Sequence, residues 1–150
     1  MKPKMFNIRV YGLVIRQGKV LLTDEIRFGI PMTKFPGGGL KPGEGTVDCL
    51  RREMREEMGV EISNVSHFYT TDFFQIARFT EPPQQLLNIY YTCTLEGIPD
   101  VVLTSQPFDF EKKQEGAQVF RWEKIDMLAC EDLTLPIDKV VLKKLQHLTG

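Results

Sequence analysis

The chain has 150 residues, 42% of them hydrophobic, and a formal net charge of −1 at pH 7. This length suits a single domain, residues 1–150, that buries a full core. The near-neutral charge argues against duplex nucleic acid as a partner, and the lack of an apolar run of about 18 residues argues against a membrane span. The three cysteines, Cys49, Cys93 and Cys130, lack metal-ligand spacing and predict reduced thiols in a cytoplasmic protein.

A β-hairpin is predicted near the N-terminus. Residues 8–15 are apolar and β-prone, Gln17-Gly18 is a turn signal, and residues 19–23 form the returning strand. Residues 24–34 are predicted to be a loop. This loop leads through Phe35 into three glycines at 37–39, where the backbone can approach a ligand closely because no Cβ intervenes.

A short helix is predicted between Thr46 and Gly59. Thr46 is expected to be its N-cap, and Gly59 is expected to end it with a positive φ. At about 100° per residue, Glu53, Glu56 and Glu57 share one arc of this helix. An apolar stripe beside that arc is expected to face the core: Val47, Leu50, Met54 and Met58.

The second half of the chain alternates strands with loops and ends in a helix. Residues 65–74 and 86–95 read as strands, separated by the breaker sequence Glu81-Pro82-Pro83-Gln84. Residues 97–114 are mostly loop, 117–122 form a late strand, and 135–148 have apolar residues at helical spacing. Strands before, between and after two helices predict an α+β fold or a mixed sheet between helices.

The three glutamates on one arc are electrostatically unusual. They crowd the C-terminal half of the helix, where the macrodipole disfavours negative charge, and like charges four residues apart repel. One interpretation is a solvated, salt-bridged helix face with the arginines at 51, 52 and 55. The other is a site for hard divalent cations, since clustered carboxylate oxygens suit Mg²⁺.

The spacing of the motif decides between these interpretations. All fixed positions of the Nudix box are present: Gly38, Glu44, Arg52, Glu53, Met54, Glu56, Glu57, Gly59 and Val60. The chain therefore resembles the Nudix (MutT-like) hydrolases. The sequence Phe35-Pro36-Gly37-Gly38 before the box and Trp122 in the late strand add support. The resemblance implies the Nudix fold, a mixed β-sheet sandwiched between α-helices, in which the box forms a loop–helix–loop.

The resemblance also implies an activity. Nudix enzymes use Mg²⁺, or Mn²⁺, to hydrolyse the pyrophosphate bond of a nucleoside diphosphate linked to another group X, with water attacking phosphorus. By this resemblance Glu53 and Glu57 are the main metal ligands and Glu56 is a further one. The carbonyl of Gly37 or Gly38 completes the set. The expected substrate is a nucleoside triphosphate or an ADP-ribose-like small nucleotide, and the expected assembly is a monomer or homodimer.

Further catalytic roles follow by the same resemblance. Arg52 is expected to hold a box glutamate in place by a charge-assisted hydrogen bond, and Glu44 is expected to order the loop. A distal acid often joins such sites from the loop before the last strand. Glu115 stands in that position with Glu111 as the alternative, and surface exposure is the competing interpretation for both. The general base is Glu53, Glu57 or the distal acid.

Specificity is expected to lie outside the box. Phe28 and Phe74 are candidates to stack on a base, as are Phe68, Phe73 and Tyr90, although core packing explains such residues equally. Asp138 either accepts a hydrogen bond from a purine N–H or caps the C-terminal helix. Two other functions compete: a nucleotide-sensing Nudix-like domain without turnover, and isopentenyl diphosphate isomerase, which needs a catalytic cysteine outside the box.

Overall fold

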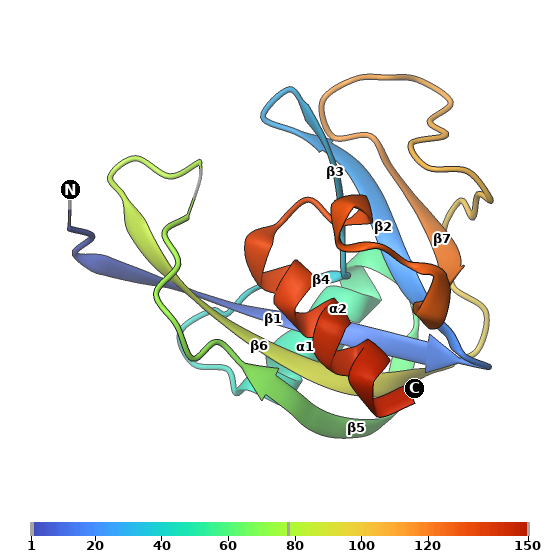
Figure 1. Ribbon diagram of the computed structural model, residues 1–150, viewed down its shortest axis with the longest axis horizontal. Coiled ribbons are helices and arrows are strands. Elements are labelled where there is room, and N and C mark those ends of the chain that lie inside the picture. The colour runs from blue at the N-terminus through green and yellow to red at the C-terminus, as the bar shows by residue number, and fades with distance from the viewer. Residues whose placement is uncertain (1, 78, 150) are drawn as a thin grey trace.

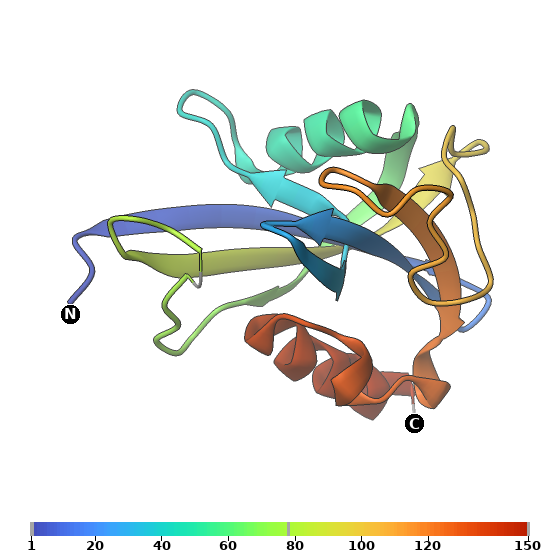
Figure 2. The same ribbon diagram turned by 90° about the horizontal axis from the view of Figure 1, so that it is seen from above.

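The computed structural model describes residues 2–77 and 79–149. Within these residues, seven strands form a mixed sheet with one α-helix on each face, and Figure 2 shows the two helices as the outer layers. This arrangement confirms the predicted sheet between helices. No helix in the described part of the chain is long and apolar enough to cross a membrane.

The strands lie in the order β3-β2-β1-β6-β5, with β4 also beside β1 and β7 also beside β2 (Figure 1). The sheet is mixed because β1 pairs parallel with β6 and antiparallel with β2 and β4. The elements are β1 (Met5–Arg16), β2 (Lys19–Arg27), β3 (Ile30–Lys34), β4 (Gly37–Gly39), α1 (Thr46–Met58), β5 (Glu61–Thr70), β6 (Gln84–Glu96), β7 (Gln118–Lys124) and α2 (Pro136–Thr149). Two short 3₁₀ turns, η1 (Ile125–Met127) and η2 (Cys130–Asp132), precede α2.

Strand β1 is central because both of its faces are buried. Its residues point alternately to the two sides of the sheet. Val10 and Val14 pack in the core beneath α1, while Tyr11 and Leu13 pack in the core beneath α2. A strand that is covered on both faces reads as a continuous apolar run, which is why this segment was recognisable in the sequence.

The two helices bury the faces that their periodicity predicts. In α1, Leu50, Met54 and Met58 are fully buried, whereas Val47 is only partly buried. In α2, the buried hydrophobic residues are Ile137, Val141, Leu142 and Leu145. The acid arc of α1 is therefore left at the border between this core and the surface.

The prediction of a loop over residues 24–34 is wrong. Strand β2 continues to Arg27, and β3 begins at Ile30 after a two-residue turn. Phe28 and Gly29 both have positive φ, at 56° and 70°, as a type I′ hairpin requires. Phenylalanine is an unusual residue for that conformation, so the sequence carries no ordinary turn signal here.

Two further boundaries differ from the predictions. Gly45, not Thr46, is the N-cap of α1, and the Thr46 hydroxyl lies 2.5 Å from the Tyr91 hydroxyl instead. At the other end Gly59 has a φ of 65°, and its N–H bonds to the carbonyl of Arg55, as expected. Strand β5 spans Glu61–Thr70 and not residues 65–74, so Phe74 lies beyond its end.

Candidate metal and nucleotide site

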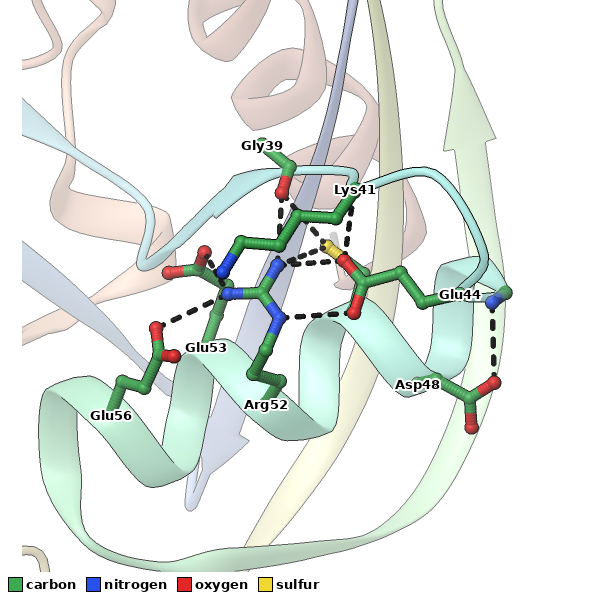
Figure 3. A network of polar contacts seen from close by, with 9 residues as sticks. Gly39, Lys41, Glu44, Asp48, Arg52, Glu53 and Glu56 are labelled. Atoms are coloured by element: carbon green, nitrogen blue, oxygen red, sulfur yellow. Dashed lines mark hydrogen bonds and ion pairs between the residues drawn. The ribbon is translucent and has the colours of Figure 1, made fainter.

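Arg52 is the centre of the polar network on α1 (Figure 3). It donates to both carboxylate oxygens of Glu44, at 3.0 and 2.7 Å, which is a bidentate pair. Its Nη1 donates to Glu53 at 2.9 Å and to Glu56 at 3.2 Å. Its Nη2 also reaches the carbonyl of Gly39 at 3.0 Å. One guanidinium thus orients three carboxylates and the preceding loop.

Glu44 closes the loop between β4 and α1. Besides its bonds from Arg52, it accepts the backbone N–H of Lys41 at 2.9 Å. The hydrogen bond from Arg52, followed by that from Lys41, lowers the pKa of Glu44 to about 2. The carboxylate therefore stays ionised at neutral pH and holds the contacts expected of the loop acid.

The glycines of β4 allow strand β1 and the Glu53 side chain of α1 to approach the β4 backbone closely. Gly37 has a φ of 148°, and a Cβ there would lie 2.1 Å from the carbonyl oxygen of Val10. A Cβ on Gly38 would lie 2.5 Å from the carboxyl group of Glu53. Strand β4 consequently forms a cradle in which the Glu53 carboxylate lies directly against the backbone.

Glu57 is the box acid whose pKa is raised most clearly. Burial raises its pKa to about 7, with further increases from the negative charges of Glu25 and Glu53. Lys34 and the backbone of Gly37 partly oppose this shift. The Oε2 atom of Glu57 is buried and has no hydrogen-bond partner among the described residues. A buried carboxylate oxygen without a partner is costly, so this atom is suited to a cation.

The residues present fit a hard divalent cation. The available donors are carboxylate oxygens of Glu53 and Glu57 and the backbone beside Gly38, which is the oxygen chemistry that Mg²⁺ prefers. In the described part of the chain, however, no three acidic, histidine or cysteine side chains already form a ligand cage. Glu56 is 55% exposed and, like Glu53, is paired with Arg52. Metal binding therefore requires these side chains to exchange partners.

A cavity of about 180 Å³ lies outside the box, and none of the described residues that line it belongs to the box. It lies between β1, β3, β6 and the start of α2, and its mouth carries Phe28 and Phe79, whose rings stack with centroids 4.9 Å apart. Arg9, Lys34 and Asn88 are among its polar lining residues. The ammonium of Lys34 pairs with Glu25 at 3.1 Å and acts on the charge of Glu57, so Lys34 links the cavity to the box.

The structure separates the predicted specificity residues. Phe28 lines the cavity, whereas Phe74 does not and is 61% exposed. Asp138 is fully buried and accepts a hydrogen bond from the Tyr90 hydroxyl at 2.6 Å. Since α2 begins at Pro136, Asp138 is its third residue and not its N-cap. Burial raises the pKa of Asp138 to about 6.

Glu115 lies at the hairpin turn between β2 and β3. Its two carboxylate oxygens accept the backbone N–H groups of Phe28 at 2.8 Å and Gly29 at 2.9 Å. No hydrogen bond or ion pair in the described residues joins Glu115 or Glu111 to a box acid. The observed contacts give Glu115 a structural role in a turn that puts phenylalanine at positive φ.

Several residues near the site were missed from the sequence: Arg9, Glu25, Lys34 and Asn88. The loop predicted over residues 24–34 includes Glu25, although alternation along β2 puts it on the same face as Leu21, which packs in the core beneath α1. Extending the predicted strand of residues 19–23 by two residues would have placed Glu25 on this face. Asn88 carries no such signal, because a single asparagine in a strand does not reveal what lies opposite.

A family model described as the NUDIX domain matches residues 5–144. The chain belongs to the NUDIX domain family. A solved MutT NUDIX hydrolase from Burkholderia pseudomallei superposes on this NUDIX chain with a TM-score of 0.73 at 17% identity, covering 95% of this chain and 99% of that one. This likeness supports the fold.

Curated relatives match mainly over part of the domain. The 8-oxo-dGTP diphosphatase of Buchnera aphidicola is 32% identical over 73 residues, which are 47% of this chain and 55% of that protein. The NAD-capped RNA hydrolase NudC of Pseudomonas putida W619 is 40% identical over 55 residues, 37% of this chain and 20% of that protein. The NUDIX chain thus spans between about a fifth and about half of these relatives.

Proposed function

We propose that this NUDIX chain is a Mg²⁺-dependent pyrophosphohydrolase of small nucleotides, which cleaves a nucleoside diphosphate linked to X by water attack on phosphorus. The observation that carries the proposal is the acid cluster of α1, in which Arg52 pairs with Glu53 and Glu56 and the Oε2 atom of Glu57 is buried without a partner among the described residues. Lys34 lines the cavity, and its positive charge lowers the pKa of Glu57, so the cavity and the acid cluster are electrostatically coupled. A nucleotide needs this combination, with an apolar site for its base beside a cation site for its phosphates.

The chain's own residues contribute positioning and charge. Glu53 and Glu57, together with the carbonyl of Gly38, would hold the cation, and Glu56 would add a further oxygen. Arg52 keeps these carboxylates in place through charge-assisted hydrogen bonds. When bound, a divalent cation polarises phosphoryl oxygens and lowers the pKa of the attacking water. The general base that accepts the proton of the attacking water would be Glu53, Glu57 or the distal acid Glu115.

The cavity favours a small nucleotide as substrate. An engineered apolar cavity of about 150 Å³ binds benzene, so the 180 Å³ here suits an aromatic ring. Phe28, which lines the cavity and is 59% exposed, is an aromatic ring against which a base could pack beside its stacked partner Phe79. The formal net charge of −1 offers no basic track for a long nucleic acid. A nucleoside triphosphate is the first choice, in keeping with the name of the Buchnera relative, and an ADP-ribose-like compound is the second.

A substrate panel tests this function. Nucleoside triphosphates, ADP-ribose, dinucleotides and nucleotide sugars are incubated with the chain in Mg²⁺ or in EDTA, and release of phosphate, pyrophosphate or nucleoside monophosphate is scored. We expect turnover of at least one compound in Mg²⁺ and none in EDTA. Turnover that persists in EDTA would contradict metal dependence. Tight binding of a nucleotide without any turnover would instead establish a nucleotide-sensing domain.

A further inference from the structure

Among the described residues that line the cavity, Thr80 and Asn88 each have a buried side-chain oxygen without a hydrogen-bond partner, and Asn88 is the more deeply buried of the two. Asn88, on β6, lines the cavity and is only 2% exposed. Its side-chain oxygen, Oδ1, is buried and has no hydrogen-bond partner among the described residues. More than nine in ten buried polar groups in folded proteins are hydrogen-bonded, so this atom calls for an explanation.

The orientation of the Asn88 amide follows from its neighbours. Tyr90 donates its single hydroxyl proton to Asp138 at 2.6 Å, which leaves a lone pair of the hydroxyl oxygen for Asn88. Only the nitrogen of the amide can donate to that lone pair, and Nδ2 lies 3.2 Å from it. The alternative amide rotamer would place two acceptors face to face. The free atom is therefore an acceptor, Oδ1, and not a donor.

The backbone of Asn88 is held as firmly as its side chain. Its N–H donates to the Thr71 hydroxyl at 2.9 Å, and its carbonyl accepts the Thr71 N–H at 2.9 Å. The Thr71 hydroxyl also donates to this carbonyl at 3.1 Å. Thr71 follows directly after β5, so two strands fix Asn88 before any ligand arrives. A fixed acceptor in a largely apolar cavity is the kind of group that gives a binding site its selectivity.

We propose that Asn88 selects the nucleobase by accepting, on Oδ1, a hydrogen bond from an amino or ring N–H group of the base. This inference rests on the proposed function, because it takes the cavity to be the base site. The proposal assigns recognition of the base to Asn88 and not to Asp138, which does not line the cavity. Asp138 instead accepts a hydrogen bond from Tyr90, and Tyr90 in turn orients the Asn88 amide. A base with a donor at this edge satisfies Oδ1, whereas a base without one leaves it unpaired and binds more weakly.

Calorimetry with nucleoside monophosphates in EDTA tests the inference without turnover. Four matched pairs differ by one donor: GMP and IMP, AMP and purine riboside monophosphate, CMP and pyrimidin-2-one riboside monophosphate, and UMP and N3-methyl-UMP. In the parent we expect at least one pair to differ by about tenfold or more in Kd, or about 1.4 kcal/mol. Parent protein that binds both members of every pair equally overturns the inference.

Variants assign the discrimination to Asn88. Asn88→Leu, similar in volume, should reduce the ratio for that pair to below about threefold. Thr92→Val, an equally conservative loss of a polar group farther along β6, should retain the parent ratio, since Thr92 bonds to the carbonyl of Ser66 away from the cavity. If Asn88→Leu does not fold, Asn88→Ser decides, because its shorter side chain does not reach the ligand. A ratio that survives the Asn88 substitution overturns the inference.

The binding experiment and the substrate panel distinguish failure of the inference from failure of the proposed activity. Hydrolysis in Mg²⁺ together with equal binding within every pair would support the proposed activity and show that Asn88 does not select the base. Discrimination that depends on Asn88, without hydrolysis of any substrate, would support base selection by Asn88 and contradict the proposed hydrolase activity.

Discussion

The box and a hydrogen-bonded group here called the floor hold polar groups in opposite ways. The floor consists of Asn88, Tyr90 and Asp138 and borders the cavity at Asn88. At the box, Arg52 and Glu53 are partly exposed and the contacts are ion pairs that share one guanidinium. At the floor, Asn88, Tyr90 and Asp138 are 2% exposed or less, and each is held by directional hydrogen bonds. Groups at the box can exchange partners when a cation arrives, whereas groups at the floor cannot. Substitutions at the box should therefore change rate, and substitutions at the floor should change stability and selectivity.

The largest effect on rate is expected from Glu53→Gln. This change removes a charge and a metal ligand but preserves the shape of the side chain, so kcat should fall by about a thousandfold or more while the melting temperature stays close to that of the parent. Glu61→Gln is the matched control, because Glu61 is exposed and pairs with Arg55 outside the acid arc. Steady-state kinetics with the best substrate of the panel check this. Activity of Glu53→Gln within about tenfold of the parent would contradict the role of Glu53.

Gly38→Ala tests whether the cradle of β4 positions Glu53. The added Cβ would meet the Glu53 carboxyl group at 2.5 Å and displace it, and a shift of about 1 Å costs about a hundredfold in rate. The neighbouring Gly39→Ala is the control, since its Cβ would meet only Arg9, at 3.6 Å. We expect lower kcat for Gly38→Ala alone, with both variants folded by circular dichroism. Equal kcat in the two variants would contradict the claim that the glycines of β4 position Glu53 for catalysis.

The same two regions differ in how far the sequence predicts them. Arg52 bonds to residues at most 13 positions away, and a fixed motif with a 3.6-residue period reveals such contacts. The floor joins Thr71 to Asn88 across 17 positions and Tyr90 to Asp138 across 48. Those contacts depend on strand order and register, which no local pattern encodes. Both helices, most strands and the acid arc were therefore predictable, and the cavity was not.

Asp138→Asn tests the cost of a buried carboxylate at the floor. The pKa of Asp138 is about 6 in the folded chain against an ordinary 3.8, so the folded chain binds this proton more tightly than the unfolded chain. The resulting stability is complete below the ordinary pKa and is lost as pH rises through 6. Asparagine does not titrate and still accepts from Tyr90. The free energy of unfolding of Asp138→Asn, measured relative to that of the parent, should therefore rise by up to about 3 kcal/mol as pH is raised from about 4 to about 7.

Urea unfolding of both proteins at the two pH values measures this difference. Asp126→Asn, an exposed substitution in η1, controls for general charge effects. A stability difference between Asp138→Asn and the parent that does not vary with pH would show that Asp138 is not the titrating group of the floor.

The smallest effect on rate is expected from Glu115→Gln. The structure uses Glu115 to hold the Phe28-Gly29 turn, so its loss should lower the melting temperature slightly and raise KM, because Phe28 borders the cavity. kcat should remain within about tenfold of the parent and close to that of Glu111→Gln. A hundredfold loss of kcat in Glu115→Gln alone would instead make Glu115 the distal catalytic acid.

Calorimetric titration with Mn²⁺ tests the central claim most directly, because it asks whether the acid arc holds a divalent cation at all. The parent chain should bind Mn²⁺, and Glu53→Gln and Glu57→Gln should each weaken that binding by about tenfold or more, while Glu61→Gln binds as the parent does. Equal Mn²⁺ affinity in all four proteins, or no binding to the parent at millimolar concentration, would show that the arc is only a solvated helix face.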